Sequence, residues 1–196
     1  MSRNRTFFNW CCVFTLLAST GYVEAVSRKP VVGKKGMAVA VEPIATKIAV
    51  DIMKKGGNAI DAAVALGFAM AVTSPSNANI GGGGFMVIRL ADGSAIAVDY
   101  REKAPGKAHG NMYLDANGDR AVNSAITLTR RDGSTHHPFT NRVHHLAIGV
   151  PGSVAGFALA LEKYGTMNIA EVIQPAIDLA EKGHVLSDRI AGALNG

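Results

Sequence analysis

The sequence predicts a layered α/β domain in which helices cover an antiparallel β-hairpin. Two β-prone apolar runs, 85–90 and 95–100, flank Asp92-Gly93, and this arrangement is a strong hairpin signal. Helical patterns lie on both sides of the hairpin rather than alternating with strands, which favours layers over a parallel sheet. Both faces of the hairpin are apolar, so each face requires a cover. The helices predicted in this chain account for one of these two covering layers.

Three elements are predicted before the hairpin. The compact apolar run 37–41 is predicted to be a strand. A helix starts at Pro43, because proline suits the first helical position and apolar residues then recur with helical spacing. Lys54-Lys55-Gly56-Gly57 stops that helix, with cations in the last turn and glycine beyond it. Asn58 caps a second helix over 59–72, which is apolar almost all round and is therefore predicted to lie in the core.

The Asp-Gly turn also predicts the register of the hairpin. If the turn has two central residues, Phe85 faces Tyr100. In the same register Gly84 faces Arg101. A glycine opposite an arginine leaves open space beside the guanidinium, so we expect an open site at Arg101.

Arg101 is the candidate binding residue. The glycine tract 81–84 lets a ligand reach the backbone, and a guanidinium beside it predicts a carboxylate pocket. The alternative is a structural ion pair with Asp99, two residues back on the same face, or with Glu102. A nucleotide site is not expected, because the tract lacks a Gly-Lys-Ser/Thr ending and a strand follows it where a dinucleotide motif needs a helix.

Helices are predicted again after the hairpin. The segment 106–147 is the least regular part of the chain and is rich in Gly, Asn, Asp, Arg and His. Pro151-Gly152-Ser153 then begins a helix. Asn168-Ile169-Ala170-Glu171 has the form of a capping box and opens another, with a kink or restart at Pro175. A last helix is predicted after Ser187.

Residues 1–25 have the pattern of a secretory signal peptide. Two arginines precede a short apolar core, and Val23-Glu24-Ala25 predicts cleavage before Val26, leaving a domain over 26–196. The apolar core is well short of the ~20 residues that span a bilayer, so no membrane span is expected after cleavage. Both cysteines lie in this segment, so the predicted mature part has no thiol chemistry.

Composition argues against other site classes. The net charge is +5 over 196 residues, and no basic stripe with interleaved aromatics is present, so no nucleic-acid partner is expected. A histidine cluster lies in a loop without a carboxylate or thiol framework, which favours an exposed polar loop over a metal site. Its members are His136, His137, His144 and His145. We expect neither a metal ion nor a cofactor.

Several motifs, in order, resemble the large subunit of γ-glutamyltranspeptidases, the glutathione hydrolase family. They span almost all of 26–196 and lie at 56–65, 79–86, 99–105, 151–157 and 163–167. The resemblance implies an incomplete N-terminal-nucleophile hydrolase αββα sandwich, in which two stacked sheets lie between helical layers. It also implies a periplasmic or secreted protein.

The resemblance further implies a reaction and a division of roles. In that family a precursor cleaves itself, and a threonine that becomes the first residue of the small subunit attacks the γ-glutamyl amide of substrates such as glutathione. The arginine of the family's Arg-Glu-x-Ala-Pro motif holds the substrate α-carboxylate and maps onto Arg101. The family's Thr-Thr-His motif is absent here, so the nucleophile is expected in a small subunit or the remainder of the precursor.

Two features depart from the family pattern. Ser134-Thr135-His136 is only a superficial echo of the nucleophile motif, because it precedes the Pro-Gly helix and has no terminal amine. The stretch from about 122 to 144 is longer than is usual, which suggests an insertion without a catalytic role. Two other functions remain open: an acylase of the same fold acting on glutaryl or cephalosporin-type side chains, and an inactive fragment or binding module that keeps only the arginine pocket.

Overall fold

The computed structural model describes residues 30–195, so the predicted signal peptide and its two cysteines lie outside the described residues. The chain divides into two units between Lys34 and Lys35, and the second unit runs from Lys35 onward. All the helices and strands below belong to the second unit. Within the described residues no helix combines the length and the apolar character needed to cross a membrane.

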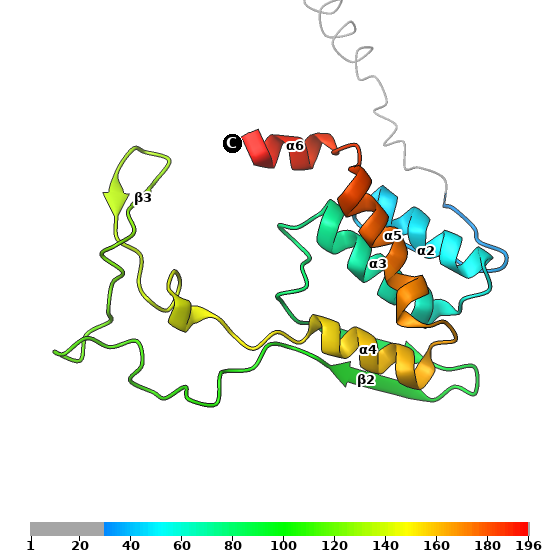
Figure 1. The fold of residues 1–196 in the computed structure, drawn as a ribbon, viewed down its shortest axis with the longest axis horizontal. Helices are drawn as coiled ribbons and strands as arrows, with labels where there is room; N and C mark the ends of the chain where they lie inside the picture. The colour runs from blue at the N-terminus through cyan, green and yellow to red at the C-terminus, as the bar shows by residue number, and fades with distance from the viewer. Residues whose placement is uncertain (1–29, 196) are drawn as a thin grey trace, which may run out of the picture. The chain divides into compact units, whose positions relative to one another are not determined.

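Four helices form the body of the second unit (Figure 1). They are α2 (Pro43–Lys54), α3 (Ala59–Thr73), α4 (Ser153–Tyr164) and α5 (Ile169–Lys182). Helix α3 contacts each of the other three, and Val64 and Ala65 on it are fully buried. The prediction of a central core helix is therefore confirmed. A short last helix, α6 (Asp188–Asn195), follows Ser187 as predicted.

The helix starts follow their predicted caps. Asn58 and Asp61 form a capping box at the start of α3, and Asn168 and Glu171 form another at the start of α5. Each box satisfies backbone N–H groups that the first helical turn leaves without partners. Helix α5 runs without a break through Pro175, so the chain does not restart there.

The hairpin consists of β1 (Phe85–Arg89) and β2 (Ala95–Asp99), paired antiparallel. Its predicted register is wrong by one residue, because Phe85 pairs with Asp99 rather than with Tyr100. Gly84 consequently faces Tyr100, and the two exchange backbone hydrogen bonds of 3.4 and 3.0 Å. In this register Arg101 lies opposite Gly83 rather than Gly84, and a Cβ atom on Gly83 would be 2.8 Å from the Arg101 Cα.

The cause of the shift is the length of the turn. The Leu90 N–H donates to the Ser94 carbonyl at 2.9 Å, which leaves three loop residues instead of two. Only Gly93 takes a positive φ, of 89°, and the Asp92 carboxylate accepts a 2.8 Å hydrogen bond from the Ser94 N–H. This is a three-residue hairpin loop with glycine at its left-handed position.

A one-residue shift in register also changes which side chains share a face. Met86, Ile88, Ile96 and Val98 are the more buried set, and Ile88 and Val98 are only 5% and 7% exposed. Helix α4 contacts β2 and supplies a helical cover for the hairpin. On the other face Phe85 is 63% and Val87 79% exposed. The predicted need for a second layer is therefore not met by the described residues.

Two other segments have little or no regular secondary structure. Residues 37–41 form no strand, and they make no strand hydrogen bonds to any part of the chain between 30 and 195. A strand needs a partner, and the local apolar pattern cannot supply one. The predicted irregular segment 106–147 contains only two very short strands, β3 (Leu128–Thr129) and β4 (Thr135–His136), and a 3₁₀ turn at His145–Ala147.

Candidate functional site

The glycine tract at 81–84 joins three segments of backbone. The Gly82 carbonyl accepts hydrogen bonds from the N–H groups of Gly152 and Ser153, at 2.9 and 3.0 Å, where α4 begins. A Cβ atom on Gly83 would lie 2.6 Å from both the Tyr100 carbonyl oxygen and the Glu102 nitrogen. Such close approach is possible only without side chains. The tract thus fixes the end of β2 against the N-terminus of α4.

The Tyr100 side chain occupies the space that the predicted register left beside Arg101. Its ring lies against Gly84, and a Cβ atom on Gly156 of helix α4 would overlap it. The ring packs edge-on against Phe157 with centroids 5.8 Å apart, and Phe157 packs against Phe68 of α3 at 5.0 Å. Burial raises the pKa of the Tyr100 hydroxyl above its ordinary value. Tyr100 therefore anchors the segment that leads to Arg101.

Arg101 is the second residue after the end of β2 and is exposed. Its backbone N–H donates to the Asp99 carboxylate at 3.0 Å, so Asp99 contacts the main chain of Arg101 and not its guanidinium. Arg101 takes part in none of the ion pairs within residues 30–195. The alternative of an ion pair with Asp99 or Glu102 is therefore not formed, and the guanidinium is open to a ligand.

Two grooves meet at Arg101. The larger, of about 530 Å³, lies between 101–105 and the loop residues Tyr113 and Ile148. The smaller, of about 240 Å³, lies between the end of β2 and helix α4. Arg101 and Lys103 line both grooves. The Lys103 backbone exchanges hydrogen bonds of 3.2 and 2.8 Å with Val150, which fixes this segment on its other side.

A third hollow lies at the glycine tract and is lined by Gly82 and Gly83. It has a volume of about 290 Å³ and is lined by Asn79, Glu102 and the buried Ser153, among others. Glu102 thus lines this hollow as well as the larger groove beside Arg101. Within the Arg-Glu-x-Ala-Pro motif, Arg101 lines the two grooves, whereas Glu102 lines the hollow and the larger groove.

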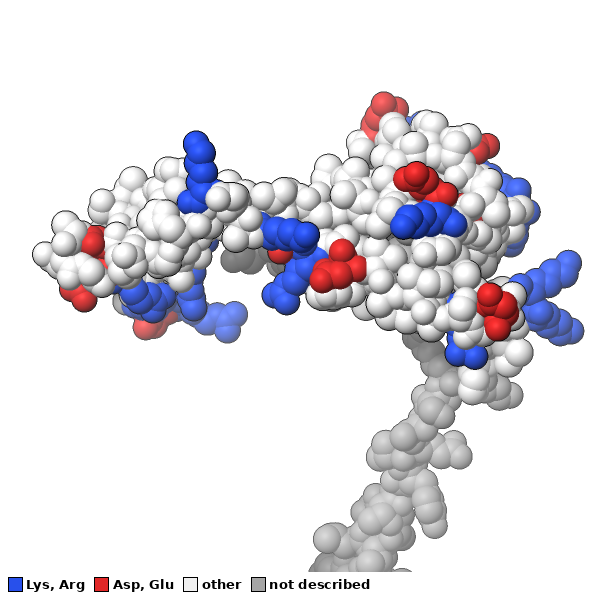
Figure 2. Space-filling view, turned by 90° about the horizontal axis from the view of Figure 1, so that it is seen from below, with Lys and Arg blue, Asp and Glu red and all other residues white. Residues whose placement is uncertain are grey.

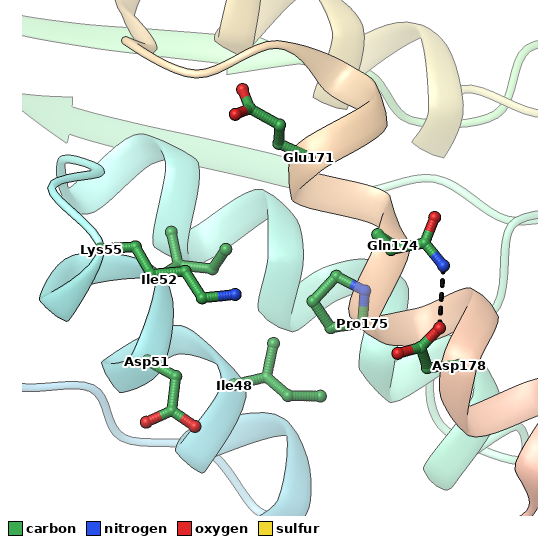
Figure 3. Close-up of a pocket in the computed structure, with 8 residues that line it drawn as sticks. All are labelled: Ile48, Asp51, Ile52, Lys55, Glu171, Gln174, Pro175 and Asp178. Atoms are coloured by element: carbon green, nitrogen blue, oxygen red, sulfur yellow. Dashed lines mark hydrogen bonds between the residues drawn. The ribbon is translucent and has the colours of Figure 1, made fainter.

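A separate pocket of about 230 Å³ lies between α2 and α5 (Figure 3). Two of its carboxylates already have partners on their own helices. The Asp178 carboxylate accepts a 2.8 Å hydrogen bond from Gln174, and Asp51 pairs with Lys47 and Lys54. The hydrogen bond and charge of Lys47 hold the pKa of Asp51 below its ordinary value. These contacts are typical of exposed helix surfaces and do not assemble a binding site.

The histidine loop makes local contacts. The Nδ1 atom of His137 lies 2.8 Å from the Ile126 carbonyl, and Nδ1 of His144 accepts from the Leu146 N–H at 3.2 Å. No three His, Cys, Asp or Glu side chains between 30 and 195 are placed to hold a metal ion. The hydroxyl of Ser134 donates to Asp132 in the turn between β3 and β4, so this residue serves the hairpin. On the face drawn in Figure 2, acidic and basic side chains are interspersed.

Comparison with known proteins assigns the chain to a family. Residues 45–196 match the family model described as gamma-glutamyltranspeptidase. The chain belongs to the γ-glutamyltranspeptidase family. It is 47% identical to the glutathione hydrolase proenzyme of Escherichia coli K12 over 165 residues, which is 84% of this chain and 26% of that protein. It is 40% identical to the acylase ACY 1 proenzyme of Pseudomonas sp. strain V22, over 85% of this chain and 28% of that protein.

Solved structures of the γ-glutamyltranspeptidase family share the fold. The Helicobacter pylori γ-glutamyltranspeptidase superposes with a TM-score of 0.72 at 45% identity, over 85% of this chain and 43% of that one. The Pseudomonas nitroreducens enzyme, in complex with L-DON, gives 0.67 at 36% identity, over 84% of this chain and 44% of that one. The predicted fold class, a partial layered α/β sandwich, is confirmed. The chain spans between a quarter and a third of the length of the curated relatives named above.

Two features of the site were missed by the sequence argument. Tyr100 was placed in the wrong register, so its contact with Gly156 was not foreseen; the glycines at 152 and 156, one helical turn apart, are the signal that indicates a close approach at this helix. Lys103 was not singled out, although it lies two residues after Arg101. Alternation along a strand-like segment is the signal that places the two residues together.

Proposed function

We propose that this chain supplies part of an enzyme that hydrolyses or transfers the γ-glutamyl group of glutathione and related γ-glutamyl compounds. Arg101 binds the α-carboxylate of the substrate. The observation that carries the proposal is the position of Arg101 between two grooves, with a guanidinium that has no ionic partner within residues 30–195. A guanidinium suits this role because its planar fork pairs bidentately with a carboxylate.

The segment that carries Arg101 is supported on both sides. Gly83 packs on its backbone, Tyr100 is wedged before it, and the bridge between Lys103 and Val150 lies beyond it. A binding side chain works best when its main chain is held in place. These contacts support a role in substrate capture rather than in bond cleavage.

The attacking group comes from another part of the protein in this proposal. A threonine that becomes the first residue of the small subunit attacks the γ-carbonyl carbon, and its own α-amine takes the hydroxyl proton. The leaving amine departs with a proton, and a glutamyl ester of the threonine remains. Water or an amino acid then attacks this ester, takes up the glutamyl group and releases the threonine hydroxyl. No catalytic residue is assigned to this chain, and the reaction requires no cofactor or metal ion.

The partner that completes the fold is the remainder of the precursor. The exposed hairpin face with Phe85 and Val87 supports this, because a sheet face with large apolar side chains is normally covered. The unpaired segment 37–41 supports it as well, since Met37, Val39 and Val41 are all more than half exposed. Residues 1–25 direct the protein to the periplasm or the exterior as a cleaved signal peptide.

The substrate profile of the complete, processed enzyme tests the proposed reaction. Glutathione, a γ-glutamyl anilide and the matching glutaryl anilide, which lacks only the α-amine, are the three substrates. Release of glutamate from glutathione with little turnover of the glutaryl compound is expected. The identity to acylase ACY 1 makes the opposite profile the second candidate, and preferential glutaryl cleavage would establish it. Residues 26–196 alone are expected to turn over none of the three.

A further inference from the structure

We propose that Lys103 is a second carboxylate-binding residue of this site, which selects γ-glutamyl substrates with a second carboxylate on the leaving-group side. The inference rests on the proposed function and deepens it. Arg101 and Lys103 are the two residues that line both grooves. The two residues are separated by one position in the chain, so one ligand in either groove is within reach of both side chains.

The Lys103 side chain is free to serve a ligand. It is exposed, and it belongs to none of the ion pairs in the part of the chain that the structure describes. Its backbone is nevertheless fixed, because both its N–H and its carbonyl are bonded to Val150. A fixed Cα with a flexible four-carbon stem suits an ammonium group that has to meet carboxylates at slightly different distances.

The acidic residues of the two grooves do not cancel the positive charge of Arg101 and Lys103. Asp99 lines the smaller groove, and its carboxylate accepts the N–H of Arg101. Glu102 lines the larger groove, but its side chain lies against Gly82 and Gly149, with Oε1 3.3 Å from the position of a Cβ on Gly82. Each groove therefore contains two cations and one carboxylate, and the resulting net positive charge complements a γ-glutamyl peptide, whose two carboxylates and one α-ammonium leave it net negative.

The chemistry of the ligand follows from this pair of cations. A substrate with the α-carboxylate alone, such as a γ-glutamyl anilide, uses Arg101 only. A γ-glutamyl peptide also carries a carboxylate beyond the scissile amide. Two kinds of substrate, called sources below, supply that second carboxylate. One is a γ-glutamyl tripeptide such as glutathione, through its C-terminus. The other is a γ-linked glutamyl dimer, through the α-carboxylate of its second residue.

The experiment compares acid and amide forms of each source in the complete, processed enzyme. The substrates are glutathione and its glycine amide, the γ-linked glutamyl dimer and its second α-amide, and a γ-glutamyl anilide. Lys103→Met removes the charge and keeps the length, Lys103→Arg keeps the charge, and Lys107→Met is the control, because Lys107 is exposed but lines neither groove.

Lys103→Met is expected to raise KM about five-fold for the acid form of at least one source, with kcat little changed, since an exposed ion pair contributes modestly. The KM values of the amide forms and the anilide are expected to be unaffected by Lys103→Met. Lys103→Arg is expected to retain the preference for the acid form over the amide form. Added salt is expected to reduce the difference in KM between the two forms. The source whose acid form responds is the one that Lys103 recognises.

Equal effects of Lys103→Met on acids and amides, or none on either, would overturn the role of Lys103 while leaving the proposed function intact. Failure of the unsubstituted enzyme to release glutamate from any of these substrates would overturn the proposed function, and this inference with it. The two failures are thus distinguishable in one set of measurements.

Discussion

The hydroxyl of Thr166 donates a 2.7 Å hydrogen bond to the buried carboxylate of Asp61, 105 residues earlier in the chain. The N–H groups of Thr166, Met167 and Asn58 donate to the same carboxylate at 2.7 to 3.2 Å. Burial raises the pKa of Asp61, but these hydrogen bonds outweigh it and hold the pKa below 3.8. The start of α3 is thereby tied to the turn between α4 and α5.

This arrangement predicts an acid-sensitive contribution to stability. Because the pKa of Asp61 is lower in the folded than in the unfolded chain, its contribution is fully present above about pH 4 and is lost as the pH falls through the folded value. Asp61→Asn is expected to reduce the free energy of unfolding by about 2–3 kcal/mol at pH 7, because the new amide N–H₂ faces backbone donors. Urea unfolding between pH 3 and pH 7 measures both effects.

Asp51→Asn is the matched control for Asp61, because Asp51 is an exposed carboxylate on α2 with only helix-surface partners. A change of less than about 1 kcal/mol is expected for it. Equal losses in the free energy of unfolding for the two substitutions would show that the buried hydrogen bonds of Asp61 stabilise the fold no more than the surface ion pairs of Asp51 do.

Gly156→Ala is predicted to disturb the support of Arg101. The new methyl group overlaps the Tyr100 ring, which is held between Gly84 and Phe157, so a loss of about 1–3 kcal/mol in stability is expected. Gly192→Ala on α6 is the control, because open space surrounds that glycine and alanine favours a helix. Thermal unfolding of both variants measures the difference.

A double-mutant cycle with Tyr100→Gly identifies the cause, because alanine would keep the Tyr100 Cβ, which lies 2.5 Å from a Cβ on Gly156. In that background the cost of Gly156→Ala should fall by more than 1 kcal/mol, since the overlapping ring is gone. An unchanged cost would place the effect elsewhere on α4.

Arg101→Ala is predicted to weaken substrate capture in the complete enzyme. Loss of a charge-assisted pair with the α-carboxylate is expected to raise KM by roughly 10- to 100-fold for a γ-glutamyl anilide, with a smaller effect on kcat. The control substrate is the 4-aminobutyryl anilide, which differs only in lacking the α-carboxylate. Its slower turnover should be insensitive to the substitution, and a parallel loss on both anilides would remove Arg101 from the binding site.

A polar substitution on the exposed face of the hairpin is predicted to have opposite effects in the isolated segment 26–196 and in the complete precursor. In residues 26–196 alone, Val87→Thr should reduce self-association, measured by analytical ultracentrifugation, because Val87 is 79% exposed. In the complete precursor the same change should cost about 1–2 kcal/mol if the remainder of the protein covers that face. Val185→Thr, at an 86% exposed position outside the hairpin, is the control for a simple change in surface polarity. Stability of the precursor unaffected by Val87→Thr would argue for another partner surface.

Local signals explain which parts of the fold could be predicted from the sequence. The capping boxes at Asn58 and Asn168 and the all-apolar stretch of α3 are determined by neighbouring residues, and the structure matches them. The strand predicted at 37–41 depended on a partner that lies nowhere between residues 30 and 195. Pattern alone gives a segment its tendency to be extended, but pairing requires a second segment.

At the site, too, the features set by neighbouring residues could be predicted and those set by distant residues could not. Arg101 could be singled out because the glycine tract and the Arg-Glu-Lys-Ala-Pro motif are short, contiguous stretches. The register could not, since Asp-Gly occurs in both two- and three-residue hairpin loops and these differ by one position. That single position decided that Tyr100, and not Arg101, lies opposite Gly84. The contact between Tyr100 and Gly156 joins distant parts of the chain and leaves little local trace.

Gly152, the N-cap of α4, and Gly156 lie where the helix meets the end of β2: a Cβ atom would overlap the Tyr100 carbonyl oxygen at the first position and the Tyr100 ring at the second. Side chains of α4 that do not contact Tyr100 can therefore diverge over evolutionary time without displacing the arginine. A larger residue at position 156 has to be accompanied by a smaller one at position 100, whereas at position 152 no side-chain change can make room, because the added atom would meet the main chain.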